Sequence, residues 1–504
     1  MRTTMIKGAT TLTRTLALAA PFLLAFPAPF LLAFPAKAGP TDIFETDERF
    51  TKLFVPGGLT ADQVSAEARA TSPMMRAKRF ASRGADAKVD EVSANFIPKL
   101  SGTARYTRLS PINQPPLSMG SGSGSLVVIN RAVTQAGPIL ASDSLLAIPV
   151  QAFTFPVFLD QWSFGGALAI PLSDYFMRFR DAIEATSGAA EVAKLEVEST
   201  AKKADLEART VYYQYIRARA QSLVAVQASE AAAAHAADAQ TAFKAGLISR
   251  ADVLRAESAV VHVRLLVDRA NNGVHLAGEA LRTLMHSPNA ELTIGENVLE
   301  PFARGDDDSS TNLLVEEALR ERPEARGLAV GVRAAKHQKS LARAGFYPRL
   351  DLVGNGAYAN PNQRIIPAKD EFIFTWDASV VASWSPSDAF SSAAQVSQAE
   401  SKRLELDAQR DALADGIYLE ITQTKTALRE ARTSLETTTL GMGSAAESYR
   451  VRREAFRAGK ATLVEVDDAA TDLTRSRLEF VDSHVALRVA ALRLAYACGR
   501  GPKS

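Results

Sequence analysis

The chain has 504 residues, a formal net charge of +2 and 47% hydrophobic residues, but only 7% of its residues are aromatic. This length is enough for two or more ordinary domains, while the few aromatic residues and the abundant alanine favour extended helical packing over a globular core. Acidic and basic residues are interleaved and their charges nearly cancel, which argues against nucleic acid as a partner. A single cysteine excludes a disulfide framework.

The N-terminus has the pattern of a secretory signal peptide over residues 1–38. Basic residues precede an apolar run at 15–34, and the tripeptide Ala-Lys-Ala at 36–38 matches a signal-peptidase site. We expect cleavage after Ala38, with 39–58 as the N-terminal segment of an exported chain. No later segment is long and apolar enough to cross a bilayer as a helix.

The first half of the mature chain, residues 59–286, predicts three helical segments and two strands. Apolar residues recur at helical spacing through a proline-free run at 178–244, which predicts one helix about 100 Å long. The predicted elements are a helix at 60–94 interrupted or opened by Pro73, strands at about 95–107 and 161–171, the long helix 178–244, and a return helix 249–286.

The second half, residues 311–499, repeats this order after a linker at 287–310 and leaves a tail at 500–504. Its predicted elements are a helix at 311–344 with Pro323, strands at about 346–358 and 373–385, a long helix 390–456, and a return helix 462–498. Each long helix and its shorter partners are expected to pack as an antiparallel coiled coil.

The two halves are copies of one unit. The segment at 242–253 recurs 213 positions later at 455–466, and each copy is a helix stopped by glycine and followed by a new helix. Trp162 recurs 214 positions later as Trp376, whereas the landmarks near Pro98 recur at an offset of 250. The chain is therefore a tandem duplication whose first half carries an insertion of about 36 residues.

The predicted strands have one apolar and one polar face. Alternation alone favours a soluble sheet with a buried face, since each transmembrane strand gives a weak signal. Two features favour an outer-membrane strand instead: a length of about 10 residues, and the position of Trp376 and Trp384 at opposite ends of the apolar face, where such strands have aromatic girdles. Trp162 is expected to be a membrane-interface aromatic residue as well. Four strands cannot close a barrel, so a cyclic oligomer is expected.

These features together resemble the TolC-type outer-membrane efflux protein family. The resemblance covers Leu59 to Gly499 and rests on the paired tips, the segment 317–326, the Phe-x-Pro-x-Leu openings at Phe96 and Phe346, and the duplication. It implies a mainly helical fold with a transmembrane β part: a homotrimer whose long helices form an α-barrel, continued by a 12-stranded outer-membrane β-barrel with four strands per chain.

The resemblance also implies partners and a location. The partners are a periplasmic membrane-fusion adaptor, an inner-membrane transporter of the RND, MFS or ABC class, and outer-membrane lipid. The channel would lie in the outer membrane of a Gram-negative envelope and extend into the periplasm. The chain departs from the family at 173–176 and 387–390, where a Gly-Gly-x-x-Arg-like element is absent, and in the insertion between Tyr106 and Trp162.

Candidate functional residues lie at the two tips. The adaptor-docking candidates are Gly246, Leu247, Ser249, Gly459 and Thr462, although the glycines are explained equally by their role as helix stops. The resemblance places an acidic periplasmic gate at Glu465 and Asp468, with Asp252, Arg255 and Lys460 nearby. Two roles stay open for Glu465, a helix cap or a member of an acidic ring. We expect Arg255 or Lys460 to pair with Asp468 in a closed state.

The sequence contains no catalytic constellation, and we expect no enzyme activity, metal or cofactor. The favoured function is the exit duct of a tripartite efflux system for small toxic compounds. Two alternatives stay open: the exit duct of a type I protein secretion system, and a non-conducting periplasmic coiled-coil protein.

Overall fold

The computed structural model describes residues 50, 52–111, 157–300 and 309–501, together with the backbone of two short strands inside the insertion. The predicted signal peptide, most of the segment 39–58, part of the linker and the last three residues lie outside the described residues.

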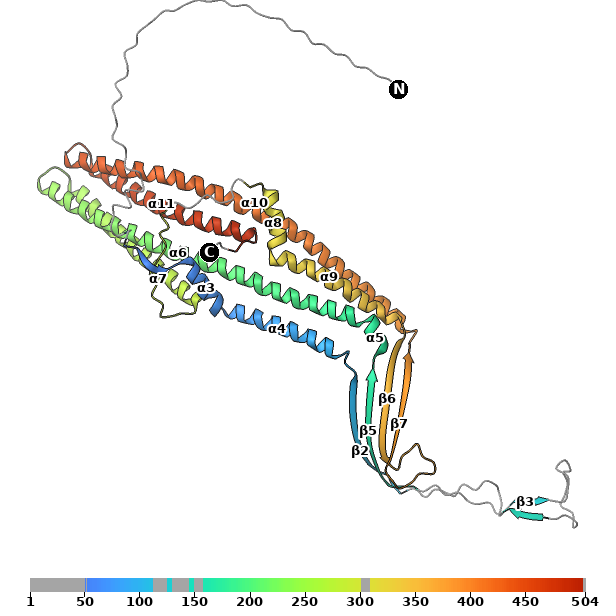
Figure 1. The fold of residues 1–504 in the computed structure, drawn as a ribbon. Helices are drawn as coiled ribbons and strands as arrows, with labels where there is room; N and C mark the ends of the chain where they lie inside the picture. Colours follow the sequence, from blue (N-terminus) through green and yellow to red (C-terminus); the bar gives the residue numbers. More distant parts are fainter. Residues whose placement is uncertain are drawn as a thin grey trace, which may run out of the picture.

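Two helical hairpins form an elongated body (Figure 1). Helix α6 (Phe179–Lys244) is followed by α7 (Arg250–Met285), and α10 (Asp388–Arg457) is followed by α11 (Leu463–Ala497). Each begins and ends within two residues of its predicted bounds. Helix α11 contacts both long helices, and so joins the two halves.

The shorter helices differ from the prediction. The single helices predicted at 60–94 and 311–344 are each two helices: α3 (Ala61–Thr71) and α4 (Pro73–Ala94), then α8 (Thr311–Glu321) and α9 (Pro323–Arg343). Each break falls at a proline in the first turn of the second helix, since proline has no N–H to continue the preceding one. The Ser72 hydroxyl caps α4 by accepting from the amide of Met75.

The middle of the body is held by the largest core cluster, which includes Tyr212, Ile216 and Phe480. Strand β1 (Phe54–Leu59) lies against the segment after α7, where the backbones of Gly58 and Gly295 approach so closely that a Cβ on either would clash. This contact pins the start of the described chain to the helical body.

The four predicted strands form one antiparallel sheet in the order β2 (Lys99–Arg108), β5 (Asp160–Ile170), β6 (Arg349–Asn360) and β7 (Ile373–Ser383). Strands β2 and β6 start later than the predicted positions 95 and 346. Residues 95–98 form a turn, and the short 3₁₀ helix η1 (Ala344–Phe346) precedes β6. A proline without an N–H lies directly before each strand, which fits a late start.

The sheet projects from one end of the helical body, away from the tips (Figure 1). The short helix α5 (Leu172–Met177), which the sequence did not predict, connects β5 to α6. A second hairpin, β3 (Ser125–Val128) with β4 (Leu145–Ile148), lies in the insertion and was also not predicted. Among the helices that the structure describes, none is both long and apolar enough to cross a membrane.

Candidate functional site

Two hairpin tips lie at the end of the body opposite the sheet (Figure 1). A glycine with a left-handed backbone stands at each tip, Gly246 at φ +72° and Gly459 at φ +68°. In the first tip the amide of Leu247 donates to the carbonyl of Ala242, and the second tip has the equivalent bond. This is a Schellman motif, which favours glycine because a Cβ is costly at positive φ.

Both helices that leave the tips begin with the predicted capping boxes. The amide of Asp252 donates to the Ser249 hydroxyl at 3.3 Å, and the Asp252 carboxylate accepts from the Ser249 amide at 3.0 Å. Hydrogen bonds from Ser249 hold the pKa of Asp252 below its ordinary value. Thr462 and Glu465 form the same pair of bonds, each at 3.4 Å. The cap role of Glu465 is therefore present in the structure.

The two tips pack against each other. Ala239 of α6, Ala256 of α7 and Leu463 of α11 are buried in one small cluster. An ion pair of 3.6 Å between Arg457 and Asp238 also joins the second hairpin to the first. The apolar side chain of Leu247, in contrast, is 77% exposed at the first tip.

The acidic residues of the second tip have different surroundings. The Glu465 carboxylate lies 3.0 Å from the guanidinium of Arg452 on the facing helix, in addition to its cap bonds. Asp468 is exposed, and within the described residues no ion pair joins it to Arg255 or Lys460. The pairing expected for a closed state is therefore absent from this single chain and stays a prediction.

Asp467 is a further acidic residue that the sequence analysis missed. Its carboxylate has an oxygen that is buried without a hydrogen-bond partner among the described residues. Burial and then the charge of Asp468 raise the pKa of Asp467, and the nearby Arg255 opposes this shift. No local motif marks this residue, because its burial depends on the packing of the two hairpins.

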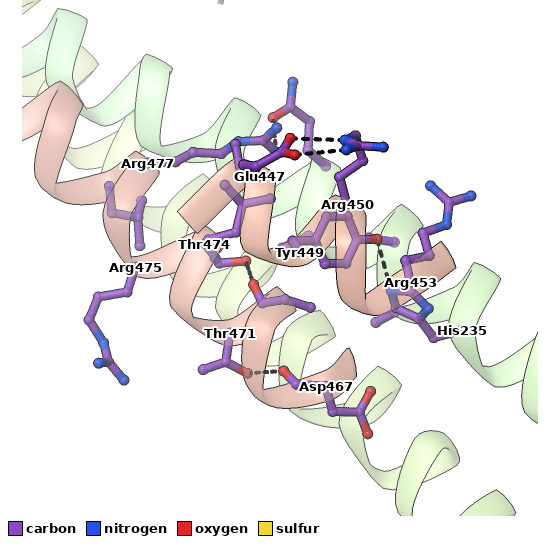
Figure 2. Close-up of a pocket in the computed structure, with 18 of the residues that line it drawn as sticks. His235, Glu447, Tyr449, Arg450, Arg453, Asp467, Thr471, Thr474, Arg475 and Arg477 are labelled. Atoms are coloured by element: carbon purple, nitrogen blue, oxygen red, sulfur yellow. Dashed lines mark hydrogen bonds and ion pairs between the residues drawn. The ribbon is translucent and has the colours of Figure 1, made fainter. Parts of the chain in front are cut away.

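Asp467 lines a groove of about 1380 Å³ between the two hairpins, close to the tips (Figure 2). Across it, the Nε2 atom of His235 on α6 lies 2.9 Å from the hydroxyl of Tyr449 on α10. Burial, and then the charge of Arg453, lower the pKa of His235. Five arginines line the groove: Arg450, Arg453, Arg457, Arg475 and Arg477.

The sheet has the two faces that the alternation predicted. In register, Trp376 of β7 opposes Gly356 of β6, while Asp377 opposes Asn355 on the other face. One face is therefore aromatic and aliphatic, and the other carries most of the charged, amide and hydroxyl side chains. The other described residues leave the apolar face uncovered, since Phe374 is 61% exposed and Val380 is 65% exposed.

The three tryptophans lie on or beside this apolar face. Trp376 is 71% and Trp384 is 63% exposed, and the eight residue steps from one to the other correspond to about 26 Å of extended chain. Outer-membrane barrels have an apolar band about 25 Å tall between aromatic girdles. Trp162 lies at the end of β5 far from the helices, 4.5 Å from the ring of Tyr106.

In the described residues, no three His, Cys, Asp or Glu side chains converge as metal ligands. Cys498 is buried in the second core cluster, where burial raises the pKa of its thiol to about 11. A neutral, buried thiol is a packing residue rather than a nucleophile.

Comparisons with known proteins agree with this architecture. The family model described as outer membrane efflux protein matches residues 64–286 and 314–500. The fold is similar to that of CusC, with a TM-score of 0.69 at 15% identity over 95% of this chain and 98% of that chain. It is also similar to the outer-membrane channel OprN, with a TM-score of 0.68 at 16% identity over 89% of this chain and 94% of that one.

A third similar structure is the outer membrane protein VceC from Vibrio cholerae, with a TM-score of 0.66 at 16% identity over 88% of this chain and 97% of that chain. Comparison with curated protein sequences finds no match.

The chain belongs to the outer membrane efflux protein family, because the family model covers most of its length in two segments. These two segments correspond to the two halves of the duplicated unit. Family membership indicates a channel protein of the outer membrane.

Proposed function

We propose that the protein is the outer-membrane exit duct of a tripartite efflux system. The observation that carries this proposal is the sheet of β2, β5, β6 and β7. Its apolar face is exposed, and among the described strands nothing pairs with the outer edge of β2 or with the outer edge of β7. In lipid, an unpaired strand edge leaves backbone groups without hydrogen bonds, which is costly.

Pairing of β7 in one copy with β2 in the next removes both free edges. Three copies would give 12 strands, and their hairpins would continue the barrel as a helical tunnel toward the tips. The proposed assembly is a homotrimer that reaches from the outer membrane into the periplasm. The polar face of each sheet then lines a water-filled passage.

The tips are the proposed docking site for a periplasmic membrane-fusion adaptor, which connects the duct to an inner-membrane transporter of the RND, MFS or ABC class. Leu247 and Ser249 at the first tip, and Lys460 and Thr462 at the second, are exposed and supply an accessible surface there. The family description, outer membrane efflux protein, supports an efflux role. Type I protein secretion is the alternative, because a wide aqueous duct need not recognise what passes.

The periplasmic entrance is proposed to be gated at the second tip. Asp468 is exposed and is not used as a helix cap, so three copies around a narrow axis would form an acidic ring. Glu465 is already held by Thr462 and Arg452 and contributes to the shape of the tip. Arg255 or Lys460 would neutralise Asp468 in the closed trimer.

Deletion of the gene, with complementation by the wild-type copy, tests the function. Efflux predicts increased susceptibility to dyes, detergents and antibiotics that the wild-type copy reverses. Unchanged susceptibility together with the loss of a protein from the medium would indicate secretion instead. If a strain without redundant ducts changed in neither respect, a non-conducting periplasmic role would be favoured.

A further inference from the structure

The loop that joins β6 to β7, residues 361–372, folds back onto the sheet. It lies at the end of the sheet away from the helices (Figure 1). Arg364 in this loop forms an ion pair with Asp377, the fifth residue of β7. Five residues of strand correspond to about 15 Å, so the guanidinium lies well inside the rim of the sheet.

The arginine lies on the polar face. Asp377 is opposite Asn355 in the register, and the Asn355 amide donates to the second Asp377 carboxylate oxygen at 3.0 Å. The neighbouring Trp376 points to the apolar face. The ion pair with Arg364 and the hydrogen bond from Asn355 therefore use both oxygens of one carboxylate.

A second contact fixes the loop along the same face. Asn362 is only 3% exposed. Its side-chain amide donates to the backbone carbonyl of Ile373 at 2.9 Å and to the Thr375 hydroxyl at 3.2 Å. The Asn362 side-chain oxygen accepts from the amide of Arg364 at 3.0 Å. Thr375 and Asp377 are two residues apart and share the polar face, so the loop is attached at two successive positions.

The end of the loop is held on the opposite face. The ring of Phe372 stacks on Tyr358 of β6, with a centroid separation of 5.1 Å. Tyr358 is opposite Phe374 in the register and so belongs to the apolar face. The loop is thus anchored over the rim by an aromatic stack outside and by polar contacts inside.

We propose that this loop narrows the outer mouth of the channel, and that the Arg364–Asp377 pair both holds the loop inward and balances the charge of the opening. The inference rests on the proposed function, because the polar face becomes a lumen only when copies close a barrel. Three loops would then project into one passage, with three arginines and three aspartates in it. Charges placed in a constriction set the ion preference of a pore.

Substitution of either residue of the pair should widen the opening, but the two substitutions should change the ion selectivity in opposite directions. Arg364→Gln leaves the Asp377 carboxylate unbalanced, so the reversal potential in a salt gradient should shift toward cation preference. Asp377→Asn leaves the guanidinium unbalanced, so the shift should be toward anion preference. Either change removes one of the two polar attachments that hold the loop on this face, so both should increase the single-channel conductance. The double variant should show the increased conductance with the selectivity of the wild type.

A matched control is available at the same end of the sheet. Arg108 and Asp160 form an exposed ion pair at 2.6 Å, in register with the ring pair of Tyr106 and Trp162 on the apolar face. Arg108→Gln should leave both conductance and selectivity unchanged, because this pair lies outside the proposed lumen. A change in Arg108→Gln equal to that in Arg364→Gln would contradict the assignment of the two faces.

The experiment is planar-bilayer recording of the purified wild-type protein and these variants in potassium chloride, with heat-modifiable migration as the check of assembly. The inference is supported if both single variants conduct more and shift selectivity in opposite directions. It is overturned if assembled variants keep the conductance and reversal potential of a conducting wild type. Absence of any wild-type conductance would overturn the proposed function and this inference with it.

Discussion

Neighbouring carboxylates at the second tip differ in what surrounds them. Asp467 is half-buried beside the groove and its pKa is raised, whereas Asp468 is exposed. A carboxylate can contribute to a charged ring around an entrance only if its side chain is exposed there. Asp468 is therefore the residue whose charge should control cation passage.

Asp468→Asn should reduce the cation preference of the channel, because it removes one carboxylate per chain and keeps the side-chain volume. Bilayer reversal potentials of the wild type and the variant measure this effect. The control is Asp411→Asn, which neutralises another exposed carboxylate on α10, far along the chain from the tip. Unchanged selectivity and conductance in Asp468→Asn would show that this residue is not part of the gate.

His484 on α11 links stability to pH. Burial, and then the charge of Arg488, lower its pKa from 6.5 to about 4. The unfolded chain therefore binds a proton before the folded chain does as the pH falls. The contribution of His484 to the free energy of unfolding is fully present above pH 6.5. It is lost as the pH falls from 6.5 to 4, and the loss amounts to about 3 kcal/mol at most.

His484→Gln should flatten this part of the pH dependence, since glutamine does not titrate. The measurement is the thermal unfolding midpoint in detergent at a series of pH values between 7 and 4. His275→Gln, at an exposed position on α7, serves as the control and should keep the slope of the wild type. If His484→Gln retained that slope as well, the buried histidine would not be its source.

At this scale, sequence predicted what local rules determine. The glycines of the tips and both capping boxes follow from residues within one turn of each other. Arg452 and Arg364 were missed because their partners lie across a hairpin or a loop, and Asp467 was missed because its burial depends on the packing of the two hairpins. The pairing of Arg452 with Glu465 could have been predicted. The two residues lie at nearly equal distances before and after the tip glycine Gly459, so an antiparallel hairpin brings them to the same level.

Among the elements, the sheet decides between a membrane channel and a soluble spacer. Successive side chains of β7 lie on opposite faces of the sheet, so substitutions at two adjacent positions probe two different environments. Val380 is on the apolar face and Ser379 is on the polar face. In a membrane barrel the first faces lipid and the second faces the lumen.

Val380→Lys should destabilise the inserted barrel by about 2–4 kcal/mol, the cost of a basic side chain facing the middle of the bilayer. Ser379→Lys should be tolerated, because a lumen-facing lysine remains in water. The measurement is the fraction of heat-modifiable protein recovered from outer membranes. Equal recovery of the two variants would indicate a sheet that does not face lipid.

The sequence predicted the bounds of an element closely where the hydrophobic pattern continues over many residues. The long helices α6 and α10 keep a helical pattern for many turns, and their observed ends agree with the prediction to within two residues. Pro73 and Pro323 were recognised as interruptions, but the sequence did not determine that each separates two helices. Helix α5 was missed because six residues are too few to show a period.

For the whole molecule, duplication explains the architecture. Each half supplies two strands and one long hairpin, and the two halves join through one sheet and one helical body. In a membrane, a single copy would be incomplete, because the outer edges of β2 and β7 are unpaired in the described sheet. The sequence predicted this need from the number of strands, while the contacts of the loop at 361–372 with the polar face could be found only from the three-dimensional register.

The most direct test of the account is the number of chains in the assembly extracted from membranes. Native mass spectrometry of the detergent-solubilised protein should give three copies of the mature chain, which supply 12 strands and leave no free edge. A stable single chain, or an assembly whose copy number is not three, would contradict the proposed duct.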